Sequence, residues 1–175
     1  MNSKNNITLK TISEVGLIAA IYVTVSLALA PFSFAATQIR VAEALTIMPV
    51  FKKRYVYAVT LGCFLANLIG FCMGQTIILD SFLGTFATFI SAMFTYQLRN
   101  IRIKDLPLLS TLPPVVINAI IVGSEITFMV KGKVFDKLFW FNAFSVAFGE
   151  FISCCIIGMV LFIFMKKIMI VKKDW

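Results

Sequence analysis

The 175-residue sequence contains no histidine, which removes the most common general base and the most common metal ligand of proteins. Its four cysteines show no C-x-x-C spacing and lie in apolar runs, so they predict buried free thiols and neither a disulfide nor a metal framework. No G-x-x-x-x-G-K-[ST] phosphate-binding motif occurs, so the chain is not expected to hydrolyse ATP. No spacing of a nucleophile and a base is recognisable. The sequence therefore predicts neither an enzyme, a cofactor nor a metal site.

Charged residues are also scarce, and most of the chain is apolar. Only 14% of the residues are charged and 60% are hydrophobic, with a mean hydropathy of +0.95. This composition predicts an integral membrane protein, whose solvent is lipid. The net charge of +8 does not indicate a nucleic-acid partner, because the basic residues form short clusters between the apolar runs and not one polar face.

The apolar runs predict an all-α, polytopic protein with one integral membrane domain over residues 1–175. A span needs about 20 apolar residues, so the chain has room for about six. The second run is short, but the basic cluster 52–54 follows it, as expected where a span leaves the membrane. Pro113 and Pro114 are expected to kink or break the fifth span. The expected spans are residues 12–30, 39–51, 55–73, 81–96, 106–128 and 139–165.

The distribution of Lys and Arg predicts the orientation. With the amino end inside, twelve basic residues lie in inner segments: Lys4, Lys10, Lys52, Lys53, Arg54, Arg99, Arg102, Lys104, Lys166, Lys167, Lys172 and Lys173. Four lie in outer segments: Arg40, Lys131, Lys133 and Lys137. This bias follows the positive-inside rule and predicts that both termini are cytoplasmic.

Four acids lie within or beside the predicted spans: Glu43, Asp80, Glu125 and Glu150. An ionisable group at membrane depth costs about 2.5 to 3.5 kcal/mol on insertion scales, so each is a functional candidate. The predicted topology places Glu43, Asp80 and Glu125 in the outer halves of their spans and Glu150 about three helical turns in from the outer end of the last span, so all four could share one outward-facing cavity. Glu150 is the leading candidate, because long apolar runs flank it on both sides.

Other polar and aromatic side chains accompany these acids: Gln38, Arg40, Asn67, Asn118, Trp140 and Asn142. Carboxylates accept paired donors, amides donate and accept, and an aromatic face stacks on a ring. The set predicts a pocket for a planar, hydrogen-bonding ligand such as a nucleobase.

Seven of these ten residues also have a purely structural interpretation. Arg40 and Glu43 could form a local ion pair, and Asp80 could cap the fourth span. Asn67 and Asn118 could join helices, Trp140 could belong to an interfacial aromatic belt, and Glu125 could be solvated at the mouth of the following loop. The sequence leaves these alternatives open.

A strip of small residues marks the first span. Gly16, Ala20, Thr24 and Ala28 recur every four residues and so share one helix face. Small side chains let another helix approach closely, which is how helices associate in lipid. The strip predicts either packing within this chain or docking onto a separate membrane subunit.

The stretch Gln38-Ile39-Arg40-Val41-Ala42-Glu43-Ala44-Leu45, followed by Pro49, resembles the QueT family. That family comprises substrate-binding (S) components of energy-coupling factor (ECF) transporters for queuosine precursors. Weaker similarity follows in order along the chain at Ala66-Asn67-Leu68, at Asp80 with Gly84, Thr85 and Thr88, at Asn118-Ala119, and at Gly149-Glu150.

The resemblance implies a six-helix bundle in the cell membrane that captures a 7-deazaguanine, such as preQ1, preQ0 or queuine, from outside. It implies docking through the first helix, at Gly16, Ala20 and Thr24, onto an ECF coupling subunit driven by two ATPases. By their charge, Glu150 or Glu43 would meet the guanine-like edge, and Glu125 would meet an exocyclic amine. The alternatives are an S component for another vitamin or a metal ion, and a self-sufficient, proton-coupled secondary transporter. The absence of histidine argues against a metal cargo.

Overall fold

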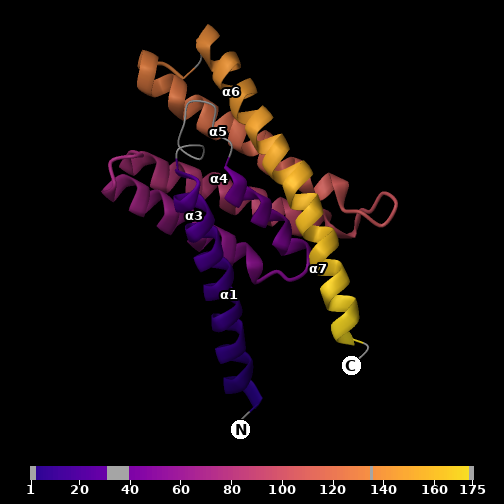
Figure 1. Cartoon of the computed structure of the whole chain (residues 1–175). Helices are drawn as coiled ribbons and strands as arrows, with labels where there is room; N and C mark the ends of the chain where they lie inside the picture. Colours follow the sequence, from indigo (N-terminus) through magenta and orange to yellow (C-terminus); the bar gives the residue numbers. More distant parts are fainter. Residues whose placement is uncertain (1–2, 31–39, 135, 174–175) are drawn as a thin grey trace.

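The computed structural model describes residues 3–30, 40–134 and 136–173, and these residues form helices and connections without a strand. Five helical segments are long and apolar enough to cross a membrane: residues Leu9–Ala28, Tyr55–Cys72, Ile78–Asn100, Leu108–Lys131 and Lys137–Ile168. They correspond to α1 (Ser3–Ala28), α3 (Tyr55–Cys72), α4 (Ile78–Gln97), α5 (Leu112–Lys131) and the composite of α6 and α7 (Figure 1). The prediction of an all-α polytopic membrane protein is confirmed.

The short segment is a 3₁₀ helix, η1 (Val41–Val50), and not an α-helix. A 3₁₀ helix rises about 2.0 Å per residue, so ten residues reach about 20 Å, against about 15 Å for an α-helix. Eight of its ten residues are buried, and it contacts α1, α3, α4 and α7. Irregular backbone at membrane depth is tolerated where protein surrounds it. η1 therefore runs through the interior of the bundle, and it carries Glu43 there.

The expectation of a kink or break within the fifth span is wrong. A short 3₁₀ turn, η3 (Leu108–Thr111), comes first, and α5 begins at Leu112. Pro113 and Pro114 therefore occupy the first turn of α5. Amide hydrogens have no intrahelical partner in a first turn, so proline loses no hydrogen bond at this position.

The last predicted span is one long rod, but it is not uniformly α-helical. α6 (Lys137–Glu150) continues through a π-helical segment, η4 (Phe151–Ile157), into α7 (Gly158–Lys173) (Figure 1). A π turn bonds residue i to i+5 and rotates the side chains that follow it. The irregular segment starts directly after Glu150.

Small residues bring neighbouring helices close together. A methyl group added at Gly62 of α3 would lie 2.7 Å from Cβ of Tyr22 on α1, and one added at Gly123 of α5 would lie 2.9 Å from Cα of Ala143 on α6. Lipid offers no hydrophobic drive for helix association, so close packing of this kind holds the helices together.

One end of the bundle gathers basic connections. Glu14 of α1 forms ion pairs with Lys52 at 3.1 Å and with Arg54 at 2.7 Å, and it accepts a hydrogen bond from the Tyr55 hydroxyl at 2.8 Å. Figure 1 shows the amino end of α1 and the carboxyl end of α7 directed to the same side of the molecule.

The rings of Phe51 and of Phe162 on α7 stack 5.1 Å apart beside this end. Leu106, in the connection between α4 and α5, packs against the same cluster. Phe51, Leu106 and helix α7 thus meet at this end of the bundle.

Candidate functional site

Polar side chains from every long helix and from η1 gather inside the bundle. Burial of this many polar groups at membrane depth is costly, and it therefore marks a candidate binding site. We call this set the polar core; its members are Tyr22, Arg40, Glu43, Cys63, Asn67, Thr88, Asn118, Glu150 and Cys154, all of them buried.

Glu43 is the most enclosed acid of the polar core, with no solvent exposure. One carboxylate oxygen, Oε1, accepts hydrogen bonds from the Tyr22 hydroxyl at 2.5 Å and from Thr88 Oγ1 at 3.2 Å. The other oxygen, Oε2, is buried without a hydrogen-bond partner. One oxygen of the carboxylate is thus fixed by α1 and α4, and the other has no hydrogen-bond partner.

Arg40 lies directly before η1 and is also buried. Among the described residues, the ion pairs within 4.0 Å are those of Glu14, so the local Arg40–Glu43 ion pair of the structural interpretation is not formed. The Nε of Arg40 has no hydrogen-bond partner. Its charge acts at longer range on Glu43 and Glu150.

Gly84 of α4 lies beside this arginine and beside Asn67. A methyl group added there would lie 3.0 Å from Nδ2 of Asn67, which is tight, and 3.5 Å from Nη1 of Arg40, which is an ordinary contact. The absence of a side chain at Gly84 therefore permits the close approach of α4 to Asn67.

Glu150, the last residue of α6, has donors on both oxygens. Nδ2 of Asn118 on α5 lies 2.9 Å from Oε1, and Sγ of Cys154 lies 3.4 Å from Oε2. The thiol of Cys154 also lies 3.4 Å from the backbone oxygen of Glu43. The π segment thus places the Cys154 thiol, which has one hydrogen to donate, within reach of both the Glu150 carboxylate and the backbone oxygen of Glu43.

Asp80 and Asn67 make the contacts of their structural interpretation. Oδ2 of Asp80 accepts a hydrogen bond from the backbone N–H of Ile77 at 3.0 Å, which caps the start of α4. Nδ2 of Asn67 donates to the backbone oxygen of Asp80 at 3.2 Å. The two side chains tie the start of α4 to α3 at the edge of the polar core.

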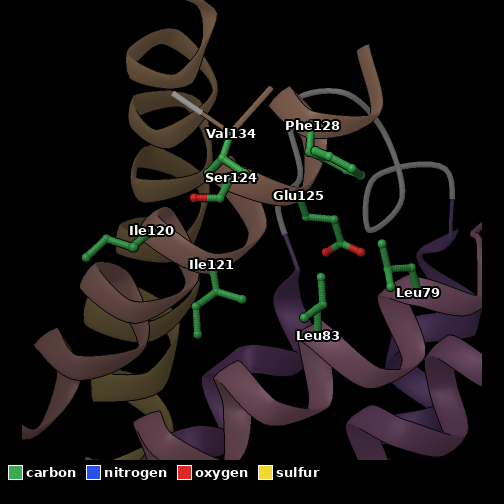
Figure 2. A pocket seen from close by; sticks show the side chains of 8 residues that line it. All are labelled: Leu79, Leu83, Ile120, Ile121, Ser124, Glu125, Phe128 and Val134. Carbon is green, nitrogen blue, oxygen red and sulfur yellow. The ribbon is translucent and has the colours of Figure 1, made fainter. Parts of the chain in front are cut away.

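Glu125 lies apart, in a cavity of about 450 Å³ between α4 and α5 that we call the α4–α5 pocket. Figure 2 shows its carboxylate directed between Leu79 and Leu83. Its side chain is only 4% exposed, and Oε1 has no hydrogen-bond partner. The walls are Leu79, Leu83, Ile120, Ile121, Ser124, Phe128 and Val134.

Two of the predicted site residues do not point into the polar core, and a third lies outside the described residues. Trp140 is 75% exposed and lies edge to face against Phe139 at 5.3 Å, which matches the alternative of a belt residue. Nδ2 of Asn142 donates to Oγ1 of Thr127 at 3.0 Å and joins α6 to α5. Gln38 lies outside the described residues.

The chemistry of the polar core is that of binding. Within the described ranges, no group of three His, Cys, Asp or Glu side chains could hold a metal ion. The core offers carboxylate acceptors, a guanidinium and amide groups in a water-poor interior, which suits a polar ligand with several donors and acceptors.

A family model described as QueT transporter matches residues 12–167. The chain belongs to the QueT transporter family. The family is one of transporters and not of enzymes, and with five apolar helices of spanning length the chain is a multi-pass membrane protein. The resemblance noted from the sequence motifs is confirmed.

One curated relative is the queuosine precursor transporter QueT of Lactococcus lactis subsp. cremoris (strain MG1363). It is 35% identical over 69 residues, which are 38% of this chain and 41% of the relative. The chain thus spans less than half of the length of the curated relative in this match. No solved structure matches the chain.

Three members of the polar core were not predicted from the sequence: Tyr22, Cys63 and Cys154. Tyr22 could have been predicted from the sequence, since a phenol in an apolar span needs a hydrogen-bond partner. The two thiols could not have been predicted, because cysteine is common in apolar interiors. Thr88, which donates to Glu43 and lies 3.3 Å from the Cys63 sulfur, was noted only through the family motifs.

Replacing Tyr22 with Phe tests the support of Glu43. The change removes the hydroxyl that donates to Oε1 and leaves Glu43 with Thr88 alone, so we expect the free energy of unfolding to fall by roughly 1 to 2 kcal/mol. The measurement is denaturant unfolding of the purified protein in detergent. Tyr57→Phe on exposed α3 surface is the matched control. Equal stability of both variants would contradict the assigned role.

Proposed function

We propose that this transporter is the S component of an ECF importer and binds a 7-deazaguanine queuosine precursor from outside the cell. The observation that carries the proposal is the polar core, in which Oε2 of Glu43 and Nε of Arg40 are buried without partners. Buried groups of this kind are rare in proteins, and a bound ligand is one way to satisfy them. Membership of the QueT family and the name of the Lactococcus relative support the substrate class.

The guanine-like edge of such a ligand presents a ring N–H beside an amino group. A carboxylate matches this pair of donors with its two oxygens. Glu43 offers a free oxygen, and Glu150 would exchange Asn118 or Cys154 for the ligand. Arg40 supplies the donor for a ring carbonyl. We assign these three side chains to the ring of the substrate.

Binding of a panel of guanine, 7-deazaguanines and common vitamins to the purified protein tests this assignment. We expect Glu43→Gln and Glu150→Gln each to weaken deazaguanine binding by about 10- to 100-fold, since a hydrogen bond to a charged group contributes about 1.5 to 3 kcal/mol. Calorimetric titration measures the affinity. Asp105→Asn, in an exposed connection, is the matched carboxylate-to-amide control.

Tight binding of a vitamin without any deazaguanine would contradict the proposed cargo. Unchanged deazaguanine affinity in both glutamine variants would contradict the proposed site.

We further propose that the protein lies in the plasma membrane with both termini in the cytoplasm. The charge bias supports this orientation, as does the meeting of α1, α7 and the basic connection 52–54 at one end. The turn after Cys72, the last residue of α3, belongs to the opposite end in this arrangement. Cys72 is exposed, whereas Cys63 and Cys154 are buried.

A membrane-impermeant maleimide added to intact cells tests the orientation. We expect it to label Cys72, because this thiol lies at the proposed outer surface, and Cys72→Ser should abolish the label. In that background, a Lys53→Cys variant should react only after the cells are permeabilised. Labelling of Lys53→Cys in intact cells would indicate the reverse orientation.

The small-residue strip supports docking onto a separate membrane subunit. Gly16, Ala20, Thr24 and Ala28 are all exposed, whereas Ala19 and Tyr22 on the same helix are buried against the bundle. A methyl group added at Gly16 would meet nothing within 4 Å. The Thr24 hydroxyl donates to the backbone oxygen of Ala20 at 2.8 Å, so this face has no unmet donor there. The face suits close approach of another helix, as an ECF coupling subunit with two ATPases would provide.

Ala20→Trp tests the docking face. The large ring prevents close helix approach, so we expect substrate uptake by cells to fall at least tenfold, while binding by the purified protein stays within about twofold. Val116→Trp, on the exposed surface of α5, is the control. Uptake driven by a proton gradient in liposomes that contain only this protein would instead identify a secondary transporter.

A further inference from the structure

Glu125 differs from the other acids of the site in its lack of neutral partners. Glu43 is held by Tyr22 and Thr88, and Glu150 has donors on both oxygens. Glu125 is also buried, with 4% of its surface exposed, yet its Oε1 has no donor. The Asp80 carboxyl lies within hydrogen-bonding reach of Glu125, but an ionised carboxylate is an acceptor and supplies no hydrogen. A buried acceptor without a donor is expensive, and an ionised one more so, so two adjacent carboxylates leave room for a donor from a ligand.

The surroundings restrict what that donor can be. Apart from the Ser124 hydroxyl, the walls around Glu125 are apolar, as Figure 2 shows. Mg²⁺ and Ca²⁺ require about six or more oxygen ligands, which this pocket does not offer. The Glu125 carboxylate needs a ligand that supplies both a positive charge and N–H donors. A primary ammonium on an apolar arm supplies both.

The charges of the region favour a cation as well. The Asp80 carboxyl lies within hydrogen-bonding reach of Glu125 and acts on it with charge of the same sign, so the two acids form a pair that a cation between them would stabilise. Arg40 also acts on Glu125, but its charge is shared with Glu43 and Glu150. Carboxylates therefore outnumber the buried cation, and an additional positive charge in the α4–α5 pocket would offset the excess.

We infer that the α4–α5 pocket binds a protonated primary amine on the substrate, with Glu125 as its counter-ion. This inference rests on the proposed function: the ring of the deazaguanine occupies the polar core, and its amine-bearing arm extends toward α5. The cavity of about 450 Å³ falls within the range of small-molecule sites. The transporter then prefers a precursor with an aminomethyl arm over one with a neutral arm.

The test compares three ligands that share the deazaguanine ring: one with an aminomethyl arm, one with the same arm N-acetylated, and one with a nitrile. Calorimetric titration is carried out with the purified full-length protein and with Glu125→Gln, which keeps the shape of the side chain and removes its charge. The wild type should bind the amine about 10- to 100-fold more tightly than the nitrile. Glu125→Gln should lose that preference and bind the nitrile with unchanged affinity.

Nitrile binding by the variant serves as the check that it is folded. A second variant, Ser124→Ala, changes the polar wall beside Glu125 without changing charge, and it should keep the preference for the amine. Equal binding of amine and nitrile by the wild type, or a preference that survives in Glu125→Gln, would overturn the inference and leave the proposed function intact. Failure of all three ligands to bind the wild type would instead overturn the proposed function itself.

Discussion

The carboxylate of Glu43 is the constraint around which the bundle is arranged. It lies fully buried on η1, and a charge at that depth is tolerated only when donors surround it. The donors come from Tyr22 of α1 and Thr88 of α4, which lie far from Glu43 in the sequence. Gly62 admits the tyrosine, because any side chain there would collide with Tyr22. The support of one acid thus sets how α1, α3 and α4 pack around η1.

The irregular backbone follows from the same requirement. A ten-residue segment must cross much of the bundle, and the 3₁₀ form of η1 extends its reach while its neighbours shield it from lipid. On the facing side, the π segment begins directly after Glu150 and brings the Cys154 thiol to both Glu150 and the backbone of Glu43. The two departures from α-helical geometry thus lie on either side of the polar core, where protein and not lipid surrounds the backbone.

Some polar atoms of the site have hydrogen-bond partners within the protein, and others have none. Asn118 and Cys154 contact the two oxygens of Glu150, and the backbone N–H of Ile77 donates to one oxygen of Asp80, so these acids also serve the fold. Oε2 of Glu43, Nε of Arg40 and Oε1 of Glu125 remain without partners. The first two atoms lie in the polar core and the third in the α4–α5 pocket, and because unpaired buried groups are costly, these are the two places where we propose that a ligand supplies the missing partners. Since Tyr22 lies on the opposite face of α1 from the exposed small-residue strip, a single helix contacts both the proposed substrate site and the proposed docking surface.

The amino-acid sequence alone is enough to assign the class of the protein. Hydropathy predicts the spans, because lipid requires long apolar helices, and the motif around Glu43 indicates the QueT family. Periodicity alone also placed Gly16, Ala20 and Thr24 on one face. The three-dimensional arrangement was needed to show that this face is exposed, that Asp80 caps α4 while Asn142 joins α6 to α5, and that Pro113 lies in the first turn of α5. The reason is that the cost of a buried polar group depends on the donors around it, and for Glu43 those donors lie 21 and 45 residues away along the chain.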